Sequence, residues 1–291
     1  MRSAEVEGPA QIICFIPVVA FFASDFCSIA LFAVSGLSYL MNLFKFYLKT
    51  TLLFIVTVTL APFYFFTLSI LYPWRQILGP ELVRFYSKIC LCIFRVRIDN
   101  VKNYRIFRKR KRGFLIISNH ASFLDIFALS GLFGSVFVSK AEVKSYPIIG
   151  QIAWLMGVIF IDRDSSRERL KILKTIAKKY SDRILAVFPQ GTTGLSSDRL
   201  PFKRGIFKVI ELNPDITLLP VTLHYKEDTE IAWHNPQSLK ENALKVFGQK
   251  RIHLKVIIHG PVTIDDYRGK TAEQICKKVE RTVLGPLQKG Y

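Results

Sequence analysis

Three uncharged apolar runs follow one another at the start of this chain, and the longest of them limits what the chain can fold into. The runs are residues 9–24, 26–44 and 50–74. The last run has 25 residues, and a helix needs about 20 mainly apolar residues to cross a hydrocarbon core of about 30 Å. The alternative, a core helix of a soluble protein, is usually shorter. Residues 1–74 are therefore predicted to form a hydrophobic membrane-anchoring segment, and residues 75–291 a separate domain.

The basic residues beside these runs bear on how the segment meets the membrane. Lys45 and Lys49 separate the second run from the third, and the basic remainder of the chain begins at Arg75. If both runs crossed the bilayer, these two basic regions would face opposite sides, against the preference of Lys and Arg for the cytoplasmic side. One run is therefore expected to dip into a single leaflet or to lie along it, with the following domain facing the cytoplasm. Pro62 is expected to kink the third run.

Composition favours a membrane surface as the partner of this chain. The chain has 41 Lys and Arg against 22 Asp and Glu, a formal net charge of +19, and half of its residues are apolar. Such a chain suits anionic phospholipid, and nucleic acid is the alternative. Because the apolar residues gather at the N-terminus and no basic arm follows, nucleic-acid binding is not expected. The five cysteines form no C-x-x-C pair, so we expect reduced, buried thiols and no bound metal.

Short β-rich runs alternate with helical segments after residue 74. The predicted strands are residues 94–98, 114–118, 136–138, 158–161, 184–188, 217–223 and 252–258. The predicted helices are residues 82–93, 165–179, 203–212 and 272–287, the last with Thr271 as its N-cap and Gln274 three residues later. Apolar strands that alternate with helices indicate an α/β fold with a largely parallel sheet covered on both faces. Ligands of such sheets bind beyond the carboxyl ends of the strands.

A histidine and an aspartate follow the predicted strand 114–118. His120 and Asp125 lie in the run Asn-His-Ala-Ser-Phe-Leu-Asp. Histidine can take up a proton near neutral pH, and a nearby carboxylate can hold it in the tautomer that does so. Asp125 also has a structural explanation, because Ser122 and Asp125 fit a capping box at the start of a helix. The two roles are compatible, since a turn before the cap would bring the carboxylate to the imidazole.

A hydroxyl-rich turn follows the predicted strand 184–188. The turn contains Gln190, Gly191, Thr192 and Thr193. Its glycine allows backbone N–H groups to approach an oxyanion or a phosphate, although an ordinary strand-to-loop turn is the alternative. Several basic residues also lie near predicted strand ends, where each alone fits a surface charge and all together can line an anion site. They are Lys140, Lys144, Arg163, Lys203 and Arg204.

In order and spacing, these pieces resemble the phospholipid and glycerolipid acyltransferase family over about residues 46–223. The resemblance rests on four blocks, N-H-x4-D at 119–125, G-V-I-F-I-D-R at 157–163, F-P-Q-G-T at 188–192 and L-P-V at 219–221. It implies a mixed sheet flanked by helices with N-terminal membrane helices. It also implies that His120 acts as a general base and that Asp125 orients it.

The resemblance further implies the substrates and the residues that bind them. An acyl-ACP or acyl-CoA thioester would be the donor and a lysolipid the acceptor, with no bound cofactor. The third block and the basic residues would hold the acceptor's head group, and these residues are Lys140, Arg163, Gln190, Gly191, Thr192, Thr193 and Lys203. No serine or cysteine flanks His120 in a nucleophile elbow, which favours direct acyl transfer over an acyl-enzyme. Backbone donors at the Gly191 turn are candidates to stabilise the oxyanion.

Two residues depart from the family pattern. The family usually has glutamate where this chain has Gln190, and often has arginine, an implied phosphate contact, where it has Thr193. Either Lys140, Arg163 and Lys203 suffice for a phosphate, or the acceptor is a lysolipid without a phosphomonoester, such as a lyso-aminolipid. The resemblance thus predicts a membrane-bound O-acyltransferase of phospholipid or glycerolipid biosynthesis with a lysophosphatidic acid-like acceptor. An acyltransferase for a non-phosphate lysolipid and a catalytically silent lipid-binding relative are the alternatives.

Overall fold

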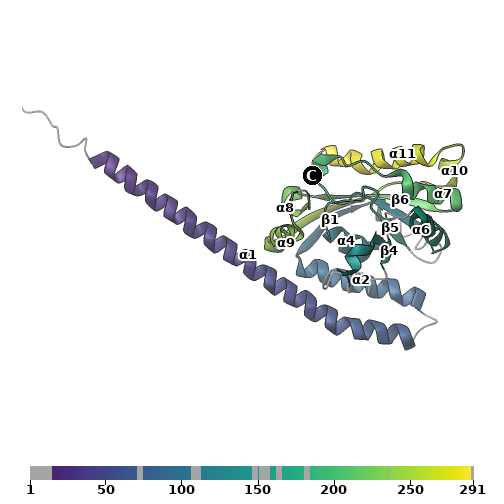
Figure 1. Cartoon of the computed structure of the whole chain (residues 1–291), viewed down its shortest axis with the longest axis horizontal. Helices are drawn as coiled ribbons and strands as arrows, with labels where there is room; N and C mark the ends of the chain where they lie inside the picture. Colours follow the sequence, from purple (N-terminus) through teal and green to yellow (C-terminus); the bar gives the residue numbers. More distant parts are fainter. Residues whose placement is uncertain are drawn as a thin grey trace, which may run out of the picture.

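The computed structural model describes most of the chain. The described residues are 15–70, 75–105, 113–145, 150, 158–161, 166–179, 184–234 and 236–289. Parts of the first and third apolar runs lie outside them, as does Arg163. Figure 1 shows a long helix, α1 (Phe15–Ile70), beside an α/β unit in which helices cover both faces of one sheet.

The sheet is mixed and largely parallel, which confirms the predicted fold class. Its seven strands are β1 (Val96–Lys102), β2 (Phe114–Ser118), β3 (Val136–Lys140), β4 (Ile159–Ile161), β5 (Leu185–Val187), β6 (Thr217–Tyr225) and β7 (Ile252–Ile258). Their order in space is β1-β7-β6-β2-β5-β3-β4. β6 and β7 are antiparallel, and the other neighbouring pairs are parallel. The predicted bounds of β2 and β7 are those observed. β1 begins at Val96, after Arg95 with a positive φ of 57°, rather than at residue 94.

Two cores lie on opposite faces of the sheet, and β2 contributes to both. Successive side chains of a strand point to opposite faces, so Ile116 packs with α2 (Arg75–Ile93) and α4 (Leu124–Phe133). Leu115 belongs to the other core, with residues of α6 (Ser166–Lys179) and α11 (Ala272–Leu284). Every residue of β2 is buried. The chain that leaves the end of β2 therefore starts from a rigid, central position.

Short helices complete the unit. They are α7 (Val209–Leu212), α8 (Asp228–Ile231), α9 (Leu239–Gly248), α10 (Ile264–Tyr267) and the 3-10 segments η2 (Ala141–Ser145), η3 (Ser196–Asp198), η4 (Arg204–Lys208) and η5 (Gly285–Lys289). The predicted helix 203–212 is thus two segments, η4 and α7. The predicted cap of α11 is confirmed, since the Thr271 side chain accepts the N–H of Gln274. This helix ends at Leu284 rather than at residue 287, and Pro286 lacks the N–H that an α-helix needs.

Helix α1 continues through Lys45 and Lys49, which divide the second apolar run from the third in the sequence. Both lysines lie inside one helix of 56 residues, which continues through Pro62. The Lys45 Nζ donates to the carbonyl of Gly248 at 3.1 Å, and the Lys49 Nζ donates to those of Phe247 at 2.7 Å and Gln249 at 3.3 Å. These carbonyls lie at the C-terminus of α9, where backbone acceptors and the helix dipole favour cations. The lysines therefore fasten α1 to the α/β unit.

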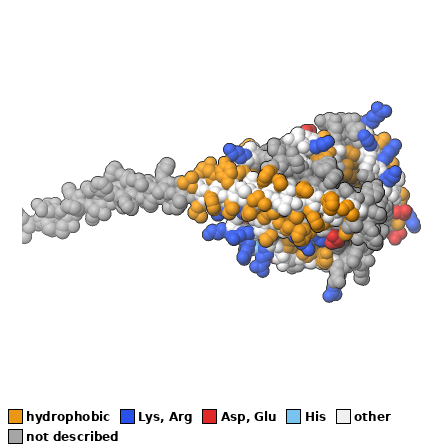
Figure 2. Space-filling model, turned by 90° about the horizontal axis from the view of Figure 1, so that it is seen from below, with side chains coloured by type: hydrophobic (Ala, Val, Ile, Leu, Met, Phe, Trp, Pro, Cys, Tyr) orange, Lys and Arg blue, Asp and Glu red, His pale blue; other side chains and the backbone are white. Residues whose placement is uncertain are grey.

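The two sides of α1 differ sharply. One side packs on the α/β unit through Leu53 and Thr57, both less than a tenth exposed. The other side exposes large apolar side chains, among them Leu40, Phe44 and Phe66 at 60% or more. Figure 2 shows hydrophobic side chains along one face of the molecule. Among the described residues, one segment, Tyr39–Tyr64, is long and apolar enough to cross a membrane.

Candidate active site

The turn between β2 and α4 is held in place by bonds from three other segments. The Asn119 side chain pairs with the backbone of Leu223, accepting its N–H and donating to its carbonyl, both at 2.8 Å. The His120 carbonyl accepts the N–H of Gly194 at 3.2 Å, and the Ala121 carbonyl accepts that of Trp233 at 2.8 Å. These bonds bring the ends of β2, β5 and β6 together. The candidate site therefore lies at the carboxyl ends of the strands, as an open α/β sheet predicts.

His120 and Asp125 meet across this turn. The His120 Nδ1 lies 2.8 Å from Oδ2 of Asp125. A carboxylate accepts hydrogen bonds, so Nδ1 carries the proton and Nε2 is left as the basic nitrogen. The carboxylate is fully buried, while the histidine side chain remains 18% exposed. The Asp125 carboxylate is thus shielded from solvent, while a substrate can reach the His120 imidazole.

The Asp125 carboxylate accepts several hydrogen bonds besides the one from His120. Its Oδ2 also accepts the backbone N–H of Ala121 at 2.7 Å and that of Ser122 at 2.9 Å. The predicted reciprocal capping box is wrong, because the Ser122 Oγ accepts the N–H of Leu124 at 3.4 Å and the Asp125 N–H goes to the Ser122 carbonyl. Phe123 takes the N-cap position instead. The Asp125 carboxylate faces His120 and accepts the Ser122 N–H, which is one of the two bonds of a capping box. The second bond, from the Asp125 N–H to the Ser122 side chain, does not form.

Tyr225 is a member of the site that the sequence reasoning missed. Its hydroxyl donates to Oδ1 of Asp125 at 2.7 Å. Burial, and then the negative charge of Asp125, raise the pKa of Tyr225 well above its ordinary value. The phenol therefore stays protonated and remains a donor. Tyr225 is the last residue of β6, which pairs with β2. Local sequence patterns do not predict the strand order that brings Tyr225 to Asp125.

Replacing Tyr225 with phenylalanine tests its role as a positioning residue. The variant loses a hydrogen bond to a charged group, so the free energy of unfolding should fall by about 1.5–3 kcal/mol. The proton affinity of the His120–Asp125 pair should rise, because its negative charge is less well stabilised. Activity requires the unprotonated imidazole, so the acid limb of the pH–activity profile should move to higher pH.

The control for this variant is Tyr86→Phe. Tyr86 lies on α2, and its hydroxyl lies 2.9 Å from that of Thr57 on α1. Neither residue belongs to the His120–Asp125 dyad. This control should leave the acid limb in place. A shift of equal size in both variants, or an unmoved limb in Tyr225→Phe, would contradict the assigned role.

The imidazole ring is also held by an aromatic stack. The ring of Phe188, which follows β5, lies parallel to the His120 ring at a centroid distance of 3.9 Å and an angle of 6°. Phe137 of β3 stacks on Phe188 in turn, at 5.5 Å. The stack fixes the plane of the imidazole, and the bond to Asp125 fixes its rotation within that plane.

Gln190 braces the backbone of the site. Its Oε1 accepts the N–H of His120 at 2.7 Å, and its Nε2 donates to the Leu200 carbonyl at 3.3 Å. The side chain is 7% exposed. An ionised carboxylate could make the first bond but not the second, because it has no donor. The glutamine is therefore well suited to this position, and its geometry is that of a positioning residue rather than a substrate contact.

The other predicted binding residues are spread around the turn after Gln190. Gly191 has a φ of 74°, which favours glycine, and its N–H donates to the Phe188 carbonyl at 3.1 Å. This N–H therefore serves the turn, and the prediction that backbone donors of the turn stabilise an oxyanion stays a prediction. Thr192 is exposed and Thr193 half-buried. Lys203 is exposed, and its N–H donates to the Pro189 carbonyl at 2.9 Å, so it adjoins the turn.

Lys140 and Arg163 are the two remaining predicted binding residues. Lys140 is the last residue of β3. Arg163 lies outside the described residues. The structure therefore brings Gln190, Gly191 and Lys203 to the end of β5, and it leaves the place of the Arg163 side chain as a prediction.

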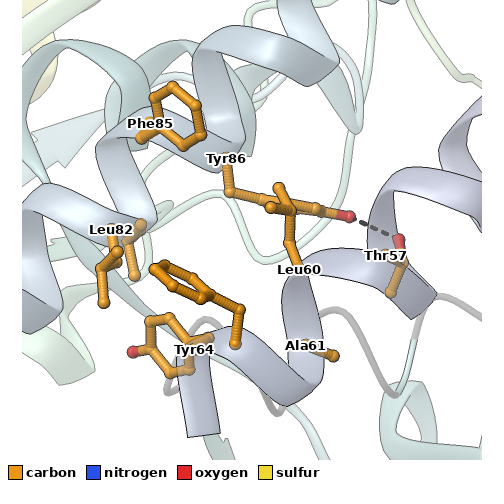
Figure 3. A pocket seen from close by; sticks show the side chains of 9 residues that line it. Thr57, Leu60, Ala61, Tyr64, Leu82, Phe85 and Tyr86 are labelled. Atoms are coloured by element: carbon orange, nitrogen blue, oxygen red, sulfur yellow. Dashed lines mark hydrogen bonds between the residues drawn. The ribbon is translucent and has the colours of Figure 1, made fainter. Parts of the chain in front are cut away.

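An apolar hollow lies away from this site, between α1 and α2. Figure 3 shows the side chains that line it and the hydrogen bond between Thr57 and Tyr86. The lining residues are Thr57, Leu60, Ala61, Phe63, Tyr64, Leu82, Val83, Phe85 and Tyr86. Neither member of the dyad is among them.

The cysteines and possible metal ligands offer no second centre among the described residues. Burial raises the pKa of the Cys90 thiol to about 12 and that of Cys276 to about 11, so both stay protonated. Cys92 is exposed, so the expectation of buried thiols is wrong for this residue. In the part of the chain that the structure describes, no three His, Cys, Asp or Glu side chains could together hold a metal ion.

Comparisons with known proteins find relatives of this chain among acyltransferases. The chain is 33% identical over 118 residues to the 1-acyl-sn-glycerol-3-phosphate acyltransferase of Neisseria gonorrhoeae, covering 40% of this chain and 46% of the relative. It is 27% identical over 223 residues to the lyso-ornithine lipid O-acyltransferase of Rhodobacter capsulatus, covering 73% of this chain and 78% of the relative. The chain thus spans about half the length of the first relative.

The fold is similar to that of a solved structure. The crystal structure of the 1-acyl-sn-glycerophosphate acyltransferase from Thermotoga maritima matches with a TM-score of 0.64 and 19% identity, covering 86% of this chain and 94% of that one. Residues 94–224 match the family model described as Acyltransferase, and this range contains both members of the dyad. Over this range the chain is therefore similar to the Acyltransferase family.

Proposed function

We propose that this chain is a membrane-bound acyltransferase that moves a fatty acyl group from an acyl-ACP or acyl-CoA thioester to the hydroxyl of a lysolipid. The observation that carries the proposal is the partly exposed His120 imidazole held at 2.8 Å by the buried Asp125 carboxylate. The pair is the general base that a hydroxyl acceptor needs. The named relatives, acyltransferases of lysolipids, support the substrate class.

The reaction proceeds by direct transfer. The Nε2 of His120 takes the proton of the acceptor hydroxyl as the oxygen attacks the thioester carbonyl. Asp125 keeps the ring oriented and stabilises the imidazolium that forms. The tetrahedral intermediate then collapses, the carbon–sulfur bond breaks, and the imidazolium returns the proton to the departing thiolate. The products are the O-acylated lipid and the free thiol.

The acceptor is better matched by a lysolipid without a phosphomonoester, such as a lyso-aminolipid, than by lysophosphatidic acid. Thr193 has no charge with which to bind a phosphate. The loop that follows it is instead tied by carboxylates, since Asp198 accepts the N–H of Leu195 at 2.8 Å and Asp228 accepts that of Ser196 at 2.9 Å. Two carboxylates beside the turn disfavour a dianionic head group.

Helix α1 is the membrane element of this proposal. Its exposed apolar side is suited to hydrocarbon, while its other side is fastened to the α/β unit by Lys45 and Lys49. Residues 1–74 then form the anchoring segment and residues 75–291 the catalytic domain, which faces the cytoplasm. Because the helix is fastened along its side, it would hold the domain against one leaflet, where lysolipids lie.

A panel of acceptors tests the function. Purified full-length protein in detergent micelles is mixed with labelled acyl-ACP or acyl-CoA and a series of lysolipids, and the products are identified by mass spectrometry. We expect an O-acylated product with at least one lysolipid. Transfer to none of them by folded protein would instead support the catalytically silent lipid-binding relative.

A Thr193→Arg exchange tests the preference for the head group. A guanidinium at this position should raise kcat/KM for a phosphomonoester acceptor by about tenfold, because charge-assisted hydrogen bonds of this kind contribute about 1.5–3 kcal/mol. Thr192→Arg is the matched control, since it adds the same charge one residue away at an exposed position. Equal gains in both variants, or none in either, would show that position 193 does not set the preference.

A further inference from the structure

Five basic residues gather where α1 meets the end of α9. We call them the α1–α9 patch, and they are Lys45, Lys49, Arg95, Lys250 and Arg251. The lysines of α1 reach the carbonyls of residues 247–249, and the next two residues of the chain are Lys250 and Arg251. The N–H of Ile252 donates to the Arg95 carbonyl at 3.1 Å, which brings Arg95 beside Arg251. Segments from three distant parts of the sequence thus form one patch.

Among the described residues, no acidic side chain forms an ion pair with this patch. Lys45 and Lys49 already satisfy the C-terminal carbonyls of α9, so the negative end of that helix is neutralised. Arg95, Lys250 and Arg251 are exposed, and none of the ion pairs among the described residues includes them. In the described part of the chain, three exposed cations are therefore available to a partner.

The patch is continuous with the exposed apolar side of α1. Phe44 and Leu48, at 68% and 48% exposed, are the immediate neighbours of Lys45 and Lys49 on the helix. Figure 2 shows Lys and Arg side chains next to the apolar face. A surface on which an apolar helix side adjoins basic residues matches the boundary between lipid tails and anionic head groups. Nucleic acid or an acidic protein would match the basic residues but not the apolar side of α1.

We propose that the α1–α9 patch binds the head groups of anionic phospholipids, such as phosphatidylglycerol, in the leaflet that receives the apolar side of α1. The inference rests on the membrane position of α1 in the proposed function. A basic side chain near an anionic bilayer strengthens binding by about fivefold. The three exposed cations would then fix which lipids surround the protein, independently of the acyl-transfer reaction.

Lipid selectivity measures this binding directly. Full-length protein is reconstituted in vesicles of equal parts phosphatidylcholine and phosphatidylglycerol with a trace of either lipid carrying a spin label. Electron paramagnetic resonance then gives the fraction of each label that is immobilised by the protein. The variant is Lys250→Glu with Arg251→Glu. The control is Lys174→Glu with Lys178→Glu, which makes the same charge change at exposed positions of α6, on the opposite face of the sheet.

We expect wild-type protein and the α6 control to immobilise phosphatidylglycerol about fivefold or more over phosphatidylcholine, and the patch variant to lose most of this preference. High salt should weaken the wild-type preference. Equal immobilisation of the two lipids by wild-type protein, or equal losses in both variants, would overturn the proposal. Acyl transfer in detergent micelles is measured in parallel and should be unchanged in both, so a failure of lipid selectivity is distinguished from a failure of the proposed reaction.

Discussion

Replacing His120 with alanine is expected to lower the rate of acyl transfer by about 10²–10⁴-fold, the usual contribution of a general base. The variant keeps the Asp125 carboxylate with its donors from Ala121, Ser122 and Tyr225, so the turn should remain folded. The change should therefore appear in kcat rather than in protein stability. The measurement is steady-state transfer of a labelled acyl group by purified variant and wild-type protein.

A histidine outside the dyad provides the control for this variant. His234 is half-buried in the segment after α8 and belongs to neither the dyad nor its aromatic stack. His234→Ala should keep activity within a few-fold of wild type. If folded His120→Ala protein also kept wild-type turnover, the imidazole would not be the base.

Asp125→Asn is expected to lower the rate by at least about 10²-fold, because the variant removes the charge that stabilises the imidazolium. The amide can be accommodated. Its oxygen can take the place of Oδ2 and accept from His120, and its nitrogen can donate to the Tyr225 hydroxyl, which then accepts. The variant therefore separates the charge of the carboxylate from its steric role. Circular dichroism and chemical denaturation would show that the protein is folded, and acyl-transfer kinetics would measure the loss.

Comparison with Tyr225→Phe distinguishes orientation from charge. That variant keeps the carboxylate and loses one donor, so its rate at high pH should exceed that of Asp125→Asn. An Asp125→Asn protein as active as wild type would mean that the carboxylate serves the fold alone.

The parts of this structure that local sequence specifies were predicted well. The continuous apolar run of β2 and the alternating pattern of β7 define their bounds, and the alternation of strands and helices indicates the sheet. The meeting of His120 and Asp125 was also predictable, because only one turn of chain separates them. Each of these features depends on residues within a few positions of one another.

The features that the sequence did not reveal depend on distant partners. Lys45 and Lys49 interrupt the apolar pattern, which predicts a break, but their partners lie about 200 positions away at the end of α9. Tyr225 reaches Asp125 from 100 positions away, through a strand order that local patterns do not contain. Gln190 similarly binds the His120 backbone from 70 positions away. Tertiary contacts therefore decide which polar side chains serve the site.

The pH dependence of kcat/KM tests the central role of the dyad most directly. The imidazole must be unprotonated to accept the hydroxyl proton, so wild-type activity should fall as pH is lowered and the ring takes up a proton. The residual activity of His120→Ala, measured on the same acceptor, should lack this acid limb. An acid limb of the same shape and position in the variant would contradict the account, because the titrating group would then be some other residue.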